Sequence, residues 1–389
     1  MTKKWSSRLT FLAFVVLMVG LGSNDSLRGI FSTIFQEHFS LTTTQLGLIV
    51  TASYIGNLVF LLVGGNLSTR FSKKRVLQVL ILIWMAALAL FAFTSNYTVL
   101  LIGMALALGS STLLNTTMNL ITPLLFATAP GFFVNFLFFT QEIGTSGSQY
   151  ILGSHADGFA FWQHTNLVLL ILGAVAFVLL LFCNVPEEAA DPADAPAQKG
   201  GYDWRIIVPY VLVFGFYFIA EHGVMNWMVA YGVDGLGLPQ ASAAKYLSVF
   251  FGGMMIGRLC LSPLVDKLGA LKSLAAFGGV SCVLYLVGSL GGAVTMPVWA
   301  ISGLSFSILY PTLVMSIRLY FPAQQVSGAA GTILSIASLA DILFNVGFGK
   351  LVDMAGYAVS IRVLPLSVLA FFIVFMLFTK FCKPTQKLK

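Results

Sequence analysis

The chain has too few charged residues for a water-soluble protein. Charged side chains make up 9% of its 389 residues, and hydrophobic ones make up 58%. A soluble domain is about 25% charged and about 45–50% apolar. Since there is too little polar side chain to cover a surface in water, we expect most of this chain to lie in a lipid bilayer.

Motifs for catalysis, metal binding and nucleic-acid binding are also missing. The sequence has no GxSxG, HExxH or Walker motif and no soluble lobe that could bind ATP, so we expect neither an enzyme nor an ATP-driven pump, and no cofactor. The net charge of +7 comes from short basic clusters between apolar runs, which does not indicate a nucleic-acid surface. The four cysteines lack metal-ligand spacing, so we expect buried thiols and no metal; they are Cys183, Cys260, Cys282 and Cys382.

The chain does contain many apolar runs of the length that spans a bilayer, about 20 residues. They predict an all-α membrane protein with helices near 8–33, 43–69, 75–94, 97–126, 131–153, 164–184, 204–232, 241–266, 270–291, 295–320, 326–352 and 359–382. The first run lacks a small-x-small cleavage pattern, so we interpret it as a retained helix rather than a signal peptide.

Polar segments predict the domains and the topology. The polar stretch 186–203 is expected to be a cytoplasmic linker between two six-helix bundles, 1–185 and 204–389. Lys and Arg cluster at both ends of the chain and in the 2–3 and 8–9 loops, whereas the loops near 34–42, 95–96 and 292–294 have none. Because cytoplasmic loops retain positive charge, both termini should be cytoplasmic, in a cell inner membrane.

The two predicted bundles resemble each other when the sequence is shifted by 197 residues. This single shift aligns Leu67 with Leu264, Arg70 with Lys267, Arg75 with Lys272, Gly131 with Gly328, and Asp25 with His222. Transporters are often built from such internal repeats. A constant register across loops and helices therefore indicates two duplicated six-helix halves.

The segment GNLSTRFSKKRVL at 65–77 resembles the loop 2–3 signature of the major facilitator superfamily, and SPLVDKLG at 262–269 resembles its second copy. The resemblance implies the twelve-helix fold of that family and transport by alternating access. It assigns conformational gating to Gly65, Arg70, Lys74, Arg75, Asp266 and Gly269. Thr69 stands at the acidic position of the first copy, which suggests that the halves do not share gating equally.

Further residues resemble the fucose permease and glucose/galactose porter branch, whose members are proton-linked sugar symporters. They are Asn24-Asp25, 114–119, Asn135 with Gly144, and Glu221 with Trp227 and Tyr231. Asn115 stands where the fucose permease has its second acid, so the coupling scheme of that branch does not transfer intact. The substrate-binding residues that we predict are Asn24, Arg28, Asn115, Asn119, Gln141, Tyr217, Glu221, Trp227, Tyr231 and Tyr310.

Ionisable residues inside spans are functional candidates by default. Asp25 and Arg28 share one helical face, which leaves two interpretations: a closed ion pair, or a carboxylate that binds the coupling proton. Glu142 and Asp341 are further candidates for proton coupling. For Glu142 a buried hydrogen-bonding role remains equally open.

Glu221 lies on one helical stripe with Tyr217, Trp227 and Tyr231. Aromatic faces beside an acid suit a sugar, although such a stripe also occurs in plain packing. Arg258 follows the small-residue run GGMMIG at 252–257. We count it among the gating residues, because we expect it to anchor a helix end or to pair with an acid rather than to bind substrate.

The sequence therefore predicts a secondary active transporter rather than a channel, since each half carries intramembrane acids. The leading hypothesis is symport of a sugar-like small molecule with a proton, sodium being left open. The alternative is an exporter or an organic-anion carrier in which Arg28 is the counter-charge. We expect a monomer in the lipid bilayer.

Overall fold

The computed structural model describes residues 3–126, 130–186 and 203–384. Within these ranges it leaves undescribed the side chains at 3, 4, 63–70, 120, 123, 130–132, 135, 266, 323, 324 and 327. The chain divides into two compact units. Unit 1 is Met1–Ala189 with Asn345–Asp353, and unit 2 is Ala190–Phe344 with Met354–Lys389.

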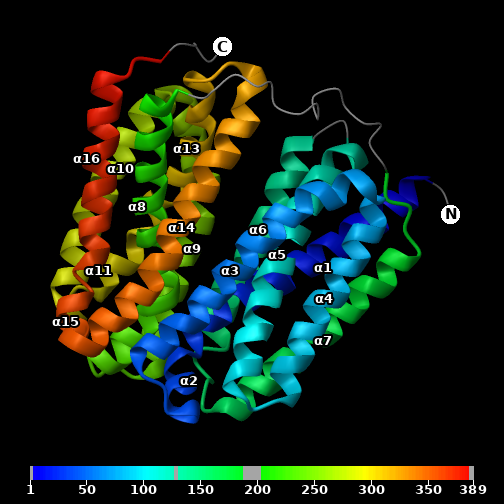
Figure 1. Cartoon of the computed structure of the whole chain (residues 1–389), viewed down its shortest axis with the longest axis horizontal. Helices are drawn as coiled ribbons and strands as arrows, with labels where there is room; N and C mark the ends of the chain where they lie inside the picture. The colour runs from blue at the N-terminus through cyan, green and yellow to red at the C-terminus, as the bar shows by residue number, and fades with distance from the viewer. Residues whose placement is uncertain (1–2, 127–129, 187–202, 385–389) are drawn as a thin grey trace. The chain divides into compact units, whose positions relative to one another are not determined.

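Unit 1 is built from long helices around α1 and α5 (Figure 1). Its helices are α1 (Lys3–Ile30), α2 (Ser32–Phe39), α3 (Thr43–Arg70), α4 (Lys73–Phe93), α5 (Tyr97–Leu125), α6 (Pro130–Ile151) and α7 (Phe159–Leu181). Helix α1 packs along α6 and α7, and α5 packs along α3 and α4. Thr43 and Thr44 N–H groups donate to Asp353 at 2.8 and 2.7 Å, so this carboxylate caps the N-terminus of α3.

Unit 2 contains both continuous and interrupted helices. They are α8 (Trp204–Ala230), η2 (Tyr231–Gly235), α9 (Gln240–Leu268), α10 (Ala270–Leu290), η3 (Gly292–Val294), α11 (Met296–Ile301), α12 (Gly303–Phe306), α13 (Leu309–Ser316), η4 (Ile317–Leu319), α14 (Ala323–Ala355), α15 (Tyr357–Ser360) and α16 (Val363–Phe381). Helix α8 packs on α16, and α9 packs on α12.

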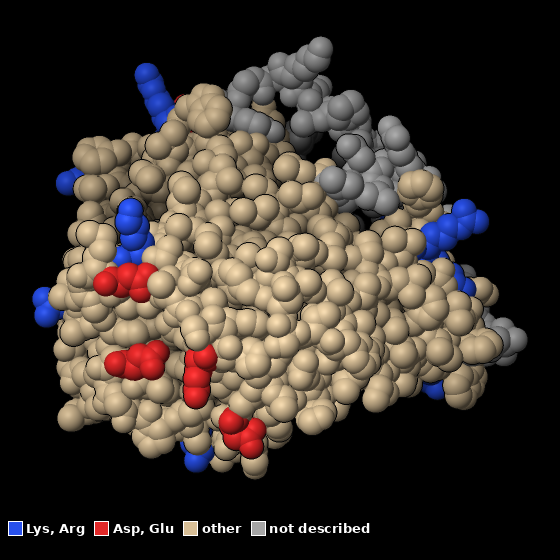
Figure 2. Space-filling model, turned by 60° about the horizontal axis from the view of Figure 1, so that its bottom comes forward, with Lys and Arg blue, Asp and Glu red and all other residues tan. Residues whose placement is uncertain are grey.

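The predicted spans agree with these helices. Among the described residues, 11 helices are long and apolar enough to cross a membrane. Helix α6, with 22 residues, occupies the place of the remaining predicted span. Figure 2 shows few charged side chains on an otherwise uncharged face of the molecule. The prediction of an all-α, multi-pass membrane protein is confirmed.

The predicted starts of α1 and α7 are each five residues late, since α1 begins at Lys3 and not near residue 8, and α7 begins at Phe159 and not near residue 164. The first turns of α7 contain polar residues. In the structure Asn166 donates to the Trp162 carbonyl at 2.8 Å, and the Trp162 side chain is buried. The amide N–H of the polar side chain therefore bonds within the helix, and the large aromatic ring is packed.

The span predicted at 295–320 is not one continuous helix. It consists of α11, α12, α13 and η4. Ser302, Ser305 and Ser307 each donate to the carbonyl three residues earlier. Side chains that bind nearby carbonyls compete with the helical ladder, and Pro311 has no N–H group to contribute to it. The sequence prediction missed this interruption because mean apolarity does not report it.

The small-residue run of α9 provides a close helix contact, as predicted. A side chain at Gly253 would press on the Leu304 backbone, and one at Gly257 would collide with Ser307. Absence of side chains at these positions lets α9 and α12 approach each other, which fixes the interrupted span within unit 2.

Candidate functional site

A close contact between α1 and α6 positions the polar residues of unit 1. A side chain at Gly22 would collide with the Gln141 carbonyl, and one at Gly144 would collide with the Val19 carbonyl. Thr145 Oγ1 donates to the Gly22 carbonyl at 3.2 Å. The backbones are therefore held together just where α1 carries Asn24 and Asp25 and α6 carries Gln141.

Asp25 is held by neutral donors. Ser111 Oγ on α5 donates to one carboxylate oxygen at 3.0 Å, and Asn24 Nδ2 donates to the other at 3.4 Å. Ser111 itself is buried. The arrangement joins α1 to α5 through a carboxylate that is not matched by a bonded cation among the described residues.

Arg28 does not form the closed ion pair with Asp25 that was one of the two interpretations of this sequence. Its guanidinium lies 5.7 Å from the centre of the Tyr54 ring on α3, a cation–π distance. The side chain is only 5% exposed. Its Nε has no hydrogen-bond partner among the described residues. A buried cation with an unused donor is suited to receive a ligand.

Three predicted residues form a chain of amides across α5 and α6. Asn119 Nδ2 donates to Asn115 Oδ1 at 2.6 Å, and Asn115 Nδ2 donates to Gln141 Oε1 at 2.7 Å. Ser111, Asn115 and Asn119 follow each other at intervals of four and so share one face of α5. Each amide offers both a donor and an acceptor, which matches the chemistry of hydroxyl groups.

Glu142 is half-buried on α6, next to Gln141 in the sequence. The structure thus brings Asn24, Asp25, Ser111, Asn115, Asn119 and Gln141 into hydrogen-bonded groups.

In unit 2 a short hydrogen bond joins α8 to α14. His222 Nδ1 lies 2.6 Å from Asp341 Oδ2, and their side chains are 24% and 2% exposed. The Phe218 ring stacks on the imidazole, with centroids 5.4 Å apart and planes at 6°. The sequence prediction named Asp341 but assigned it no histidine partner. The signal that could have drawn attention to His222 was the repeat shift, because it aligns His222 with Asp25.

The predicted aromatic stripe of α8 divides into two clusters. Tyr217 stacks on Phe306 at 5.0 Å and on Tyr310 at 5.9 Å. Glu221 and Arg258 both lie within electrostatic range of the Tyr217 and Tyr310 hydroxyls. Tyr217, Glu221, Arg258 and Tyr310 therefore form one neighbourhood within unit 2.

Tyr231 belongs to the other cluster. Its ring packs against Trp299 at 6.1 Å and Tyr357 at 6.4 Å. Trp227 is fully buried. The structure does not place Tyr231 in ring contact with Tyr217 among the described residues, because the two positions are 14 residues apart, which is about 21 Å along a helix axis.

Comparison with known proteins identifies the family. The sequence profile of the Major Facilitator Superfamily matches residues 10–340. This chain belongs to the Major Facilitator Superfamily. Its members of known structure share the fold: FucP, solved in the outward conformation, aligns with a TM-score of 0.65 and 20% identity over 96% of this chain and 99% of that chain.

Several superfamily relatives are named as carriers. The L-fucose-proton symporter of Escherichia coli (strain K12) is 23% identical over 74% of this chain and 75% of its own length. The glucose/galactose transporter of Brucella abortus is 26% identical over 91% and 90%. The 3-(3-hydroxy-phenyl)propionate transporter of E. coli is 26% identical over 93% and 94%. The chain is thus a superfamily transporter, not an enzyme, and resembles sugar carriers.

The predicted gating residues of the superfamily loop lie partly outside the description, since the side chains of Gly65, Arg70 and Asp266 are not described. Lys74 Nζ donates to the Leu181 and Cys183 carbonyls at 3.1 and 2.7 Å and so caps the end of α7. Gly269 has φ +80° at the junction of α9 and α10, where a residue with a side chain would be strained.

Proposed function

We propose that this superfamily transporter carries a neutral, sugar-like solute together with a proton by alternating access. The observation that carries the proposal is the polar group of unit 1, in which neutral donors hold the Asp25 carboxylate and a chain of amides runs from Asn119 to Gln141. The amides suit solute hydroxyls, and the carboxylate suits a proton. The names of the fucose and glucose/galactose relatives support the same solute class.

Transport assays in proteoliposomes test this function. Addition of a transported monosaccharide outside should alkalinise the external medium, because solute and proton enter together. A panel of neutral sugars, sugar acids and nucleosides identifies the class. If a sodium gradient drives sugar uptake without any proton movement, the coupling ion is sodium and not the proton.

An organic anion is the second candidate solute. It is favoured by Arg28, which is buried, carries an unpartnered Nε and is bonded to no carboxylate among the described residues. Arg28→Lys should retain the uptake of a neutral solute but strongly weaken that of a carboxylate, because lysine lacks the planar two-pronged donor. If the wild type prefers anions and Arg28→Lys abolishes that preference, the solute is an organic anion rather than a neutral sugar.

The proposed setting is a cell inner membrane, with a monomeric protein and both termini in the cytoplasm. The positions of Lys and Arg support this topology. Single cysteines at Ser72 and in the linker 186–203, in a chain otherwise free of cysteine, should react with a membrane-impermeant thiol reagent only from the cytoplasmic side. Labelling of either site in intact cells would overturn the topology.

A further inference from the structure

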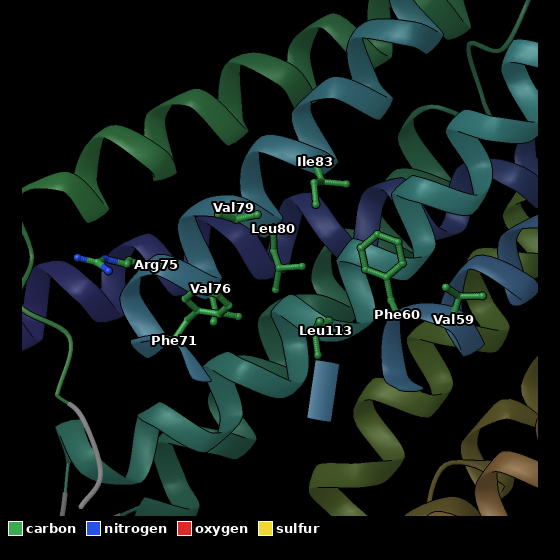
Figure 3. Close-up of a pocket in the computed structure, with 9 residues that line it drawn as sticks. All are labelled: Val59, Phe60, Phe71, Arg75, Val76, Val79, Leu80, Ile83 and Leu113. Atoms are coloured by element: carbon green, nitrogen blue, oxygen red, sulfur yellow. The ribbon is translucent and has the colours of Figure 1, made fainter. Parts of the chain in front are cut away.

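A groove opens between α3 and α4 in unit 1. Both helices pack along α5 but contact each other little. The glycines of α3 and α5 bring these two helices together, since a side chain at Gly56 would collide with Ala105. Beyond that contact, an apolar cavity of about 660 Å³ lies between α3 and α4 over α5 (Figure 3).

The groove has a buried floor and an exposed rim. Its lining residues are Val59, Phe60, Phe71, Arg75, Val76, Val79, Leu80, Ile83 and Leu113. Val76, Leu80 and Leu113 are at most 7% exposed, whereas Val59, Phe71 and Val79 are about half exposed. In a membrane-spanning unit, such a rim faces lipid, so the natural occupant of the groove is a hydrocarbon chain.

One cation lies at an end of this apolar lining. Arg75 lies in the first turn of α4. Among the described residues that line the groove, it alone is charged. Its side chain is exposed and has no ion pair or side-chain hydrogen bond among the described residues. Figure 3 shows it at the end of the row of α4 residues that leads to Ile83.

We propose that this groove binds one acyl chain of an anionic phospholipid, whose phosphate pairs with Arg75. From Arg75 to Ile83 the helix rises about 12 Å, which is close to one leaflet of the hydrocarbon core, about 15 Å. On the proposed topology Arg75 lies at the cytoplasmic surface, where basic pockets between helices bind anionic headgroups. This site is distinct from the polar group formed by Asp25 and the amides, and it does not depend on the identity of the solute.

The position of the groove indicates what the lipid would do. Its headgroup end lies at the loop between α3 and α4, the loop that resembles the gating signature of the superfamily. A bound phospholipid would bridge the two helices where the described residues of α3 and α4 make few direct contacts. It would therefore stabilise the present spacing of α3 and α4.

Native mass spectrometry of the purified full chain tests the site. The protein is mixed with phosphatidylglycerol and phosphatidylcholine in equal amounts, and the retained lipid is identified. The wild type should prefer phosphatidylglycerol by about fivefold, as expected for one cation at a headgroup. Arg75→Gln should reduce the preference to near one. Lys272→Gln, at the repeat-equivalent position, should leave it unchanged.

A second pair of variants tests the groove itself. Val79→Trp places a large ring on the rim and should reduce retention of both lipids, whereas Val178→Trp, at a similarly exposed valine of α7, should not. Inorganic phosphate should not displace the lipid, since the acyl chain contributes to binding. Equal retention of both lipids by the wild type, displacement by phosphate, or equal effects of the two tryptophan variants would each overturn the proposal.

Discussion

Helices α1 and α8 occupy equivalent places in the two halves of the sequence, yet they carry opposite chemistry at the aligned position. Asp25 in α1 is held by Ser111 and Asn24, both neutral. His222 in α8, aligned with it by the repeat shift, lies 2.6 Å from the Asp341 carboxylate. Unit 1 thus holds an acid without a directly bonded cation, and unit 2 holds an acid that is bonded to a histidine.

The difference suggests that the two acids have different roles. A carboxylate without a directly bonded cation is costly in a membrane while it is charged, so it favours gaining and losing a proton as its surroundings change. A paired acid is bound to a second helix and favours a fixed arrangement. We infer that Asp25 carries the coupling proton and that His222–Asp341 ties α8 to α14. The predictions below test this comparison.

The largest effect is expected from Asp25→Asn. The amide preserves the shape of the side chain but removes the titration, and a ligand can shift a conformational equilibrium only through differential affinity for its states. Accumulation against a gradient should fall to the equilibrium level. Solute binding and counterflow exchange should remain, as measured in proteoliposomes with labelled sugar.

Glu37→Gln, which changes an exposed acid of α2, is the matched control and should accumulate solute normally. If Asp25→Asn still accumulates solute and keeps the wild-type pH dependence, Asp25 is not the coupling acid. Glu142 and Asp341 would then be the acids to replace.

The next largest effect concerns the pair in unit 2. Asp341→Ala or His222→Ala removes one partner of a hydrogen bond to a buried carboxyl group, which costs about 1.5–3 kcal/mol. Each should lower the unfolding temperature of the detergent-solubilised protein by about 2–4 °C. Replacing both residues should cost less than the sum of the single effects by about 1 kcal/mol, because the residues are coupled. Additive effects would show that the pair does not stabilise unit 2.

Sequence patterns predicted the helices well because apolar length is a strong and local signal. The same patterns could not predict bonds between helices. Asp341 was identified as an intramembrane acid, but its partner lies 119 residues away on α8. Ser111 was missed although it continues the interval of four that joins Asn115 to Asn119. The sequence shows a polar stripe at intervals of four on this helix, but the prediction included only Asn115 and Asn119 of its three members.

The aromatic stripe shows the opposite error. Tyr217 and Tyr231 are on one helix, and helical spacing alone suggested a common wall. Their rings contact different partners, Phe306 and Tyr310 for the first and Trp299 and Tyr357 for the second. These partners lie on α12, α13, α11 and α15, short pieces whose interruptions the sequence prediction missed. Neighbours within a helix could be predicted, whereas neighbours across helices could not.

A smaller effect is expected from Glu221→Gln in unit 2. If this acid hydrogen-bonds solute hydroxyls, loss of its charge should weaken binding by at least about tenfold, since bonds to charged groups contribute about 1.5–3 kcal/mol. Equilibrium binding of labelled solute measures the effect. Asp234→Asn, the same exchange at an exposed acid of η2, should bind normally. If Glu221→Gln binds solute normally but no longer accumulates it, Glu221 acts in proton coupling and not in solute binding.

The smallest effect is expected from Asn115→Ala in unit 1, where the site offers neutral amides. This change interrupts the chain between Asn119 and Gln141 at its centre, and a neutral hydrogen bond contributes about 1 kcal/mol. Solute binding should therefore weaken by about fivefold. Thr116→Ala is the matched control, because among the described residues the Thr116 hydroxyl donates only to the Thr112 carbonyl of its own helix, and this variant should bind solute normally. An effect of Asn115→Ala larger than that of Glu221→Gln would reverse the comparison, since unit 1 would then carry solute binding as well as the proton.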